Sequence, residues 1–140
     1  MPIPIPEPGL VIQYQYLWRH EAERGRDNAR YPRPCAIVVA VRRGEGEETE
    51  VVLAPMTHQP PEPGRPGIEL PAGVRRALGL PERTWIVPDE VNAFVWPGFD
   101  LVPNAAGDYV WGRLPPALHE RLRLEVLAAV REGRLRQTRR

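Results

Sequence analysis

The sequence predicts a mainly β fold with some α structure, a small and strongly curved β-barrel or half-barrel with helical caps. Several short runs rich in β-branched and aromatic residues are separated by proline and glycine turn signals, which is typical of β structure. Two stretches have helical spacing instead, a short one inside the chain and a longer one toward its end. The length of 140 residues suits one domain that buries an ordinary core.

The first segments predict an arm, a strand and a loop. Residues 1–8 alternate proline with other residues and are expected to form an extended arm, because proline fixes φ and disfavours helix before it. Residues 9–16 alternate in character and predict the first strand. Residues 18–32 are polar and rich in arginine, and their His-Glu-Ala-Glu-Arg stretch is too short for an independent helix. We therefore expect a functional loop there.

Two apolar runs of similar length, residues 35–42 and 50–56, predict a β-hairpin closed by the acidic turn of residues 44–48. Arg33 precedes the first run, and Thr57 and His58 follow the second. In an antiparallel pair these side chains emerge at the same rim of the sheet. A cation, a hydroxyl and an imidazole there suit a phosphate or a nucleic-acid backbone, because arginine offers a fixed fork of donors to phosphate oxygens.

The middle of the chain predicts short elements between proline-rich connections. In order, we expect a structureless segment at 59–66, a strand at 67–70, a helix at 71–80, a strand at 84–87, a loop at 94–103 and a last strand at 109–114.

The best helix in the sequence begins at Pro115-Pro116. Leucine, valine and alanine then recur at intervals of three and four residues and form one apolar stripe, and Gly133 is the natural stop. The barrel domain is thus expected to span residues 9–133, followed by a frayed, solvated basic tail at 134–140.

Composition excludes several classes of protein. The hydrophobic fraction is 42% and no apolar run approaches the ~20 residues of a membrane span. The N-terminal residues lack the basic and continuous apolar regions of a secretory signal, so we expect a cytoplasmic protein. One cysteine and three scattered histidines predict no internal disulfide and no zinc or iron site, and we expect no cofactor.

The charge of the chain does not by itself indicate nucleic-acid binding, because the formal net charge is only +1. Every basic residue is nevertheless an arginine, and five arginines lie between Arg19 and Arg33. Genome composition and a functional surface both explain this pattern.

The order of the motifs resembles the MazF/PemK/Kid family of toxin endoribonucleases from toxin-antitoxin systems. A first strand beginning at Gly9 leads into a loop with the segment His20–Gly25, Arg33-Pro34-Cys35 opens an apolar strand, and Pro55-Met56-Thr57-His58 ends the next strand. The resemblance covers about residues 8–133 and implies an SH3-like, PemK/CcdB-like barrel. The chain differs from the family pattern in the extra stretch 26–32 and in the segment 89–92, which lacks the arginine often found there.

The resemblance implies roles for individual residues. Arg33 would stabilise the phosphate, Thr57 would hold a phosphate oxygen and Glu21 would be the catalytic base. Contacts with the substrate are expected from a second set of side chains, namely His58, Glu23, Arg26 and Asn92.

Each of these residues also has an ordinary structural explanation. Arg33 could pair with a loop carboxylate such as Asp27, and Thr57 could bond its own backbone at the strand end. Glu21 and Glu23 could be solvated, and His58 could be a surface residue or a second acid or base. Trp96 is either a core aromatic or a stacking partner for a base.

The implied activity is metal-independent, sequence-specific cleavage of single-stranded RNA, in which the ribose 2′-hydroxyl attacks the adjacent phosphorus and leaves a cyclic phosphate and a 5′-hydroxyl. The family also implies a homodimer and a cognate antitoxin protein that occupies the RNA groove. Two alternatives remain, an inactive RNA- or protein-binding module on the same barrel and a gyrase-poisoning toxin of the same fold.

Overall fold

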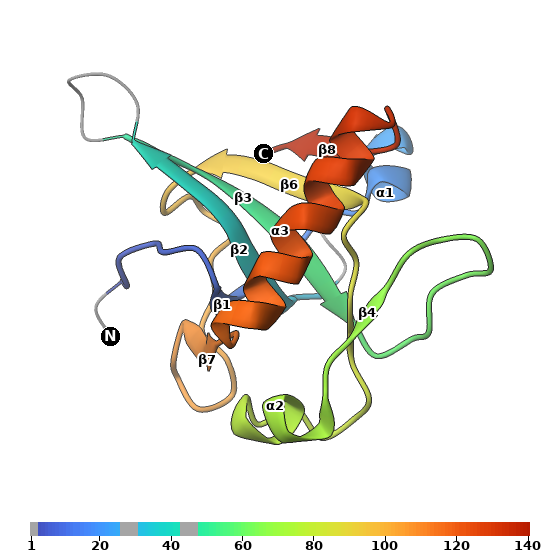
Figure 1. Ribbon diagram of the computed structural model, residues 1–140. Coiled ribbons are helices and arrows are strands. Elements are labelled where there is room, and N and C mark those ends of the chain that lie inside the picture. The colour runs from blue at the N-terminus through green and yellow to red at the C-terminus, as the bar shows by residue number, and fades with distance from the viewer. Residues whose placement is uncertain (1–2, 26–30, 43–47) are drawn as a thin grey trace.

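The computed structural model describes residues 3–25, 31–42 and 48–140, and these form a mainly antiparallel sheet, curled into a half-barrel, with three helices (Figure 1). In chain order the elements are β1 (Leu10–Tyr14), α1 (Arg19–Glu23), β2 (Arg33–Arg42), β3 (Thr49–Thr57), β4 (Ile68–Glu69), α2 (Ala72–Ala77), β5 (Trp85–Ile86), β6 (Glu90–Val95), β7 (Val110–Arg113), α3 (Pro116–Arg131) and β8 (Arg136–Arg139).

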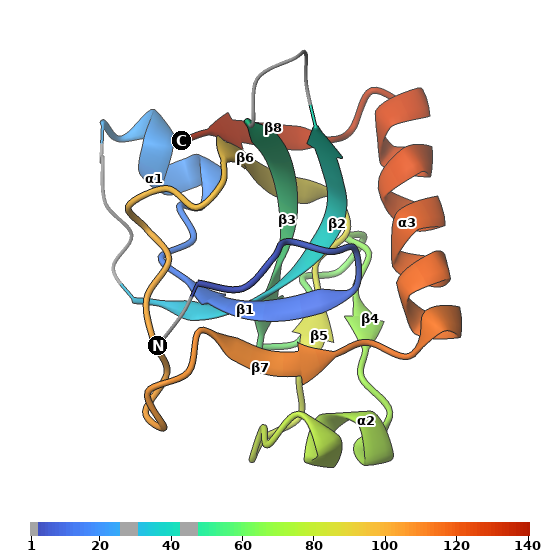
Figure 2. The ribbon, with the colours of Figure 1, turned by 90° about the vertical axis from the view of Figure 1, so that its left-hand side faces the viewer.

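The sheet curls because β3 changes its partner along its length. On one side β3 pairs with β2, as the predicted hairpin requires, and β2 continues through β1 to β7. On its other side the first half of β3 pairs with β6, whereas Met56 and Thr57 pair with β5. A bulge between Ile37 and Val39 of β2 adds local twist to the same hairpin. Figure 2 shows the resulting curvature of β1, β2 and β3.

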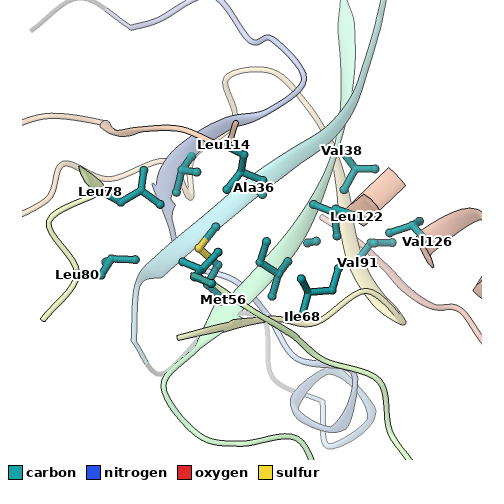
Figure 3. Packing of buried hydrophobic residues seen from close by; sticks show 14 residues of the cluster. Ala36, Val38, Met56, Ile68, Leu78, Leu80, Val91, Leu114, Leu122 and Val126 are labelled. Carbon is teal, nitrogen blue, oxygen red and sulfur yellow. The ribbon is translucent and has the colours of Figure 1, made fainter. Parts of the chain in front are cut away.

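Alternating side chains of the hairpin supply two hydrophobic cores, one on each face of the sheet. Ala36 and Val38 of β2 enter the first core, and Cys35 and Ile37 enter the second. The first core lies between the sheet and α3, and Figure 3 shows its close packing. Both faces are therefore buried, which explains why the hairpin sequence is a continuous apolar run.

Helix α3 covers the first core, as its apolar stripe predicts. Pro115 and Pro116 start the helix, since proline is compatible with the first turn. Leu122, Val126 and Ala129 are its buried residues and lie at helical spacing. The helix ends at Arg131, and Gly133 follows with a φ of +67°, a conformation that glycine adopts without strain.

Most of the predicted strands and the short internal helix are confirmed, but three elements were not predicted. The first is α1, which forms within the segment that we expected to be a loop. Glu21 accepts a hydrogen bond from the Trp18 backbone N–H (3.2 Å), and the Arg19 N–H donates to Glu90 (3.0 Å). These contacts stabilise a helix that is too short to form alone.

The second is β6, whose first residues carry no predicted secondary structure and whose last residues overlap the expected loop at 94–103. Its residues Glu90 and Asn92 are polar and yet buried, with exposed fractions of 2% and 0%. Polar side chains weaken the sequence signal for a strand, and here their hydrogen-bond partners are Tyr16 and Leu17 in the β1–α1 connection.

The third is β8, and it corrects the prediction that residues 134–140 are a frayed tail outside the barrel. Arg136–Arg139 pair in parallel with β6, and Thr138 is buried. Arg139 forms an ion pair with Glu50 (2.6 Å), and Arg140 forms one with Asp100 (3.0 Å). The end of the described chain is thus part of the sheet.

The proline-rich arm contains no helix or strand over residues 3–8 and is held against the half-barrel by two contacts. The Trp96 indole N–H donates to the Pro4 carbonyl oxygen (3.1 Å), and Glu7 contacts Arg113. The Trp96 ring packs against Phe94 and does not line the groove described below. Trp96 is therefore a packing residue, the first of its two expected roles. The predicted acidic turn falls mostly on residues 43–47, which lie outside the described residues.

Candidate functional site

Arg33 and Thr57 lie at the same end of the β2–β3 hairpin, as predicted. Cys35 is opposite Pro55 in the antiparallel register, and Arg33 and Thr57 each lie two residues beyond that pair. Both side chains line an open groove of about 650 Å³ that also receives Glu21 from α1 and His58 from the residue after β3. All three residues expected to be catalytic are thus brought to one groove.

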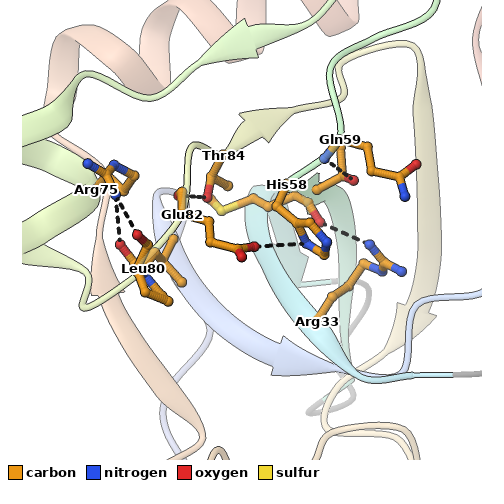
Figure 4. A network of polar contacts seen from close by, with 10 residues as sticks. Arg33, His58, Gln59, Arg75, Leu80, Glu82 and Thr84 are labelled. Carbon is orange, nitrogen blue, oxygen red and sulfur yellow. Dashed lines mark hydrogen bonds and ion pairs between the residues drawn. The ribbon is translucent and has the colours of Figure 1, made fainter.

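The guanidinium of Arg33 is held in place by the protein. Its Nη1 donates to the Met56 carbonyl oxygen at 3.3 Å (Figure 4), and its Cζ lies 4.9 Å from the centroid of the Trp18 ring. Its Nε is buried and has no hydrogen-bond partner among the residues that the structure describes. Because one aromatic face and one carbonyl fix the group, its charge is preorganised at the groove.

The Thr57 hydroxyl has a structural role at the strand end and can still donate a hydrogen bond into the groove. Its Oγ1 accepts a hydrogen bond from the Gln59 backbone N–H at 3.2 Å, so the hydroxyl stabilises the strand end. A hydroxyl that accepts one bond still has its own proton to donate. Thr57 can therefore donate to an anion in the groove without breaking the turn.

Glu21 is buried, with an exposed fraction of 7%, and it lines the groove from α1. Its Oε1 accepts the Trp18 N–H, which fixes the carboxyl at the start of the helix. The same turn positions Trp18 under Arg33, so the carboxylate and the guanidinium are held by one local structure.

Glu90 is a candidate functional residue that the sequence reasoning missed. It lines the same groove, and its Oε2 accepts hydrogen bonds from the Tyr16 hydroxyl (3.1 Å) and the Arg19 N–H (3.0 Å). Burial raises the pKa of the Glu90 carboxyl above its usual value. Burial and the nearby charge of Glu90 raise the pKa of the Tyr16 hydroxyl well above its own usual value. Glu90 belongs to the segment 89–92, in which the sequence pointed to Asn92, and its burial depends on distant partners that the sequence does not reveal.

We expect the variant Glu90→Gln to change how stability depends on pH. The folded-state pKa of Glu90 is raised, so the folded protein retains this proton to higher pH than the unfolded chain. The free energy of unfolding of the wild type should therefore fall, relative to E90Q, as pH rises from about 4 toward 7. Urea unfolding at several pH values measures this difference, and E48Q controls for the loss of one exposed carboxylate. A pH-independent difference would contradict the prediction.

His58 lies at the junction of the groove with a smaller hollow of about 240 Å³. Its side chain is 66% exposed, and its Nδ1 is 3.9 Å from Glu82 Oε2. Figure 4 shows this contact between His58 and Glu82. Tyr31, Arg33, Thr57 and His58 line both hollows and so form the ridge between them.

The structure does not place three of the expected substrate-contacting residues in the groove: two lie elsewhere, and the third is outside the described residues. Asn92 is fully buried and bonds both backbone groups of Leu17, at 2.9 and 2.8 Å, so the structure gives it a structural role in place of a substrate contact. Glu23 is 63% exposed, pairs with Arg19 and does not line the groove. Arg26 lies outside the described residues, as does Asp27, the expected partner of Arg33.

One wall of the groove is the proline-rich segment 59–66, and an ion pair ties it to the sheet. Arg65 donates two hydrogen bonds to Asp89, from Nε at 3.2 Å and from Nη2 at 2.8 Å, and the Asp89 side chain is only 8% exposed. A Cβ on Gly67 would lie 2.8 Å from Pro61 Cγ, so the segment is folded closely on itself. The wall is thus a tethered, compact loop.

We expect Arg65→Ala to loosen this wall and to cost about 2 kcal/mol of stability, because the charge of Asp89 is left buried without its two donors. The matched control is Arg83→Ala, which removes a similar two-bond pair with Glu69 on an exposed surface and should have a much smaller effect. Denaturant unfolding compares the stabilities, and the backbone amides of segment 59–66 should exchange hydrogen faster in R65A only. Equal losses in the two variants would contradict this role.

Two absences hold for the described residues. Within them, no group of three or more His, Cys, Asp or Glu side chains is placed to hold a metal ion. None of the helices in the described ranges combines the length and the apolar composition that crossing a membrane requires. Cys35 is fully buried, as expected, and burial raises the pKa of its thiol, so it packs as a small apolar residue.

Comparison of the chain with protein-family models, with curated proteins and with solved structures found no match. The assignment of a function therefore depends on the groove itself.

Proposed function

We propose that this protein is a metal-independent endoribonuclease that cleaves single-stranded RNA in the groove at the end of the β2–β3 hairpin. The observation that carries the proposal is the convergence of Arg33 and Thr57 with a buried carboxyl, Glu21, in one open groove. Cleavage by internal transfer needs a proton acceptor, a proton donor and a cation near the charged phosphorus, and these side chains supply them.

The proposed reaction begins when the ribose 2′-oxygen attacks the adjacent phosphorus and its proton passes to Glu21. Arg33 and the Thr57 hydroxyl donate to the phosphate oxygens, on which negative charge develops. The bond from phosphorus to the 5′-oxygen then breaks, and that oxygen takes a proton from the imidazolium form of His58. The products are a 2′,3′-cyclic phosphate and a 5′-hydroxyl.

The proposal extends to the fold and to the biological role. The curled sheet with its terminal covering helix is compatible with an SH3-like barrel of the PemK/CcdB type. A toxin of this kind would act in the cytoplasm as a homodimer and would be inhibited by a cognate antitoxin protein.

The test is to incubate the purified protein with a long RNA in EDTA and to map the ends of the fragments. Defined fragments with cyclic phosphate and 5′-hydroxyl ends are expected. Intact RNA would overturn the proposal. Intact RNA with tight RNA or protein binding would then indicate an inactive module, and growth arrest with gyrase-linked DNA breaks would indicate a gyrase-targeting toxin.

A further inference from the structure

The smaller hollow beyond the ridge has the size and the lining of a site for one aromatic ring system. Its volume of about 240 Å³ is below the about 300–1,000 Å³ of pockets that hold drug-sized ligands. Tyr31, 64% exposed, borders it on the ridge, and the buried Leu80 and the exposed Pro81 also line it. A flat apolar ring fits such a space, and an exposed tyrosine offers it a stacking surface.

The backbone turn on the polar side of this hollow is held in position, and the Glu82 side chain that it carries is 67% exposed. Arg75 Nη1 donates to the carbonyl oxygens of Leu80 (3.4 Å) and Pro81 (3.0 Å), and the Thr84 hydroxyl donates to the Glu82 carbonyl oxygen (2.8 Å). Figure 4 shows these bonds on both sides of Glu82. The turn that carries the Glu82 carboxylate is therefore tied to α2 at one end and to the start of β5 at the other.

We propose that the small hollow is a nucleobase subsite that selects guanine, with the ring stacked on Tyr31 and its edge read by Glu82. The inference rests on the proposed ribonuclease function, since it places the base beside the phosphate held by Arg33 and Thr57. The ridge residues line both hollows, so a phosphate bound there has the small hollow on one side and the main groove on the other.

Guanine follows from the chemistry of Glu82. An ionised carboxylate only accepts hydrogen bonds, through two oxygens. Guanine presents two neighbouring donors on its pairing edge, N1–H and the N2 amino group, which match a carboxylate in a two-bond contact. Adenine and cytosine offer an amino group beside a ring acceptor, and uracil places its single N–H between two carbonyl oxygens. His58 Nδ1 lies 3.9 Å from Glu82 Oε2, an ion-pair contact when the imidazole is protonated but too long for a hydrogen bond, so it occupies neither hydrogen-bonding position of the carboxylate.

The experiment uses short single strands in which one ribonucleotide fixes the cleavage position and the bases on each side of its phosphate are varied. Wild-type protein should cleave with a kcat/KM at least about tenfold higher for guanine than for uracil at one of the two positions. Glu82→Ala and Glu82→Gln should reduce this ratio to below threefold. Tyr31→Ala should lower kcat/KM about tenfold for all bases, and Tyr31→Phe should retain it. Glu48→Gln, at the other end of β3, should change neither quantity.

A binding measurement separates this inference from the nuclease proposal. Fully 2′-deoxy strands cannot be cleaved by this reaction, and their affinity is measured by fluorescence anisotropy. A guanine preference that is lost in E82A supports the subsite even if RNA stays intact. A preference of cleavage and binding that is unchanged in E82A, or the absence of any preference in the wild type, overturns the subsite while leaving the nuclease proposal to its own test.

Discussion

Replacing Arg33 by alanine should lower RNA cleavage about 100-fold to 1,000-fold, the usual effect of removing a preorganised donor from a developing negative charge. Arg33 is fixed by the Trp18 ring and by the Met56 carbonyl oxygen, so its guanidinium is already oriented before substrate binds and little further conformational entropy is lost. Arg33→Lys keeps the charge but loses the planar fork, and it should recover only part of the rate. Initial rates on a defined RNA measure both variants.

The chain provides a close control for this substitution. Arg83 lies over Trp85 with its Cζ 4.9 Å from the ring centroid, the same distance as between Arg33 and Trp18, but it does not line the groove. Arg83→Ala should leave the cleavage rate unchanged. If R33A and R83A lose activity equally, or if R33A retains full activity with an intact fold by circular dichroism, Arg33 does not act on the phosphate.

The location of Arg33 and Thr57 was predictable because it depends on local sequence signals. Two apolar runs of similar length joined by a short polar turn pair antiparallel with few alternatives, and the residues at the open end of such a hairpin must meet. Arginine and threonine at that end could therefore be placed from the sequence. The same reasoning placed α3, whose apolar stripe is long and regular.

The buried polar side of the site could not be predicted in this way. Glu90 and Asn92 lie in the strand β6, but their polar character indicates a loop when the partners are unknown. Those partners, Tyr16 and Leu17, are more than 70 residues away in the chain. Helix α1 and strand β8 depend on long-range contacts with the same strand, β6. The Arg19 N–H donates to Glu90, and Thr138 is the register partner of Asn92. Local patterns contain no signal for such pairs.

Asn92 shows how strongly these distant contacts hold the site. Its Oδ1 accepts the Leu17 N–H and its Nδ2 donates to the Leu17 carbonyl oxygen, so one side chain satisfies both backbone groups of a residue in the β1–α1 connection. Arg140 Nη1 donates to the same Oδ1 at 3.3 Å. Trp18, which follows Leu17 in the chain, begins the turn that supports Arg33. Asn92 therefore does not line the groove and supports it through Leu17 and the neighbouring Trp18.

Asn92→Ala should cost about 3–4 kcal/mol of stability, because two buried backbone groups of Leu17 lose their partners and a small cavity remains. Asn92→Asp should cost a similar amount, since it keeps the shape but sets a carboxylate oxygen against the Leu17 carbonyl oxygen. The matched control is Asn104→Ala, whose side chain accepts two backbone hydrogen bonds in an exposed to partly buried turn, at 3.0 and 3.1 Å, and whose loss should cost under about 1 kcal/mol. Denaturant unfolding gives the three values. A loss of stability in N92A no larger than that in N104A would mean that the hydrogen bonds between Asn92 and Leu17 do not stabilise the fold. Helix α1 alone would then have to hold Trp18 and Arg33 in place.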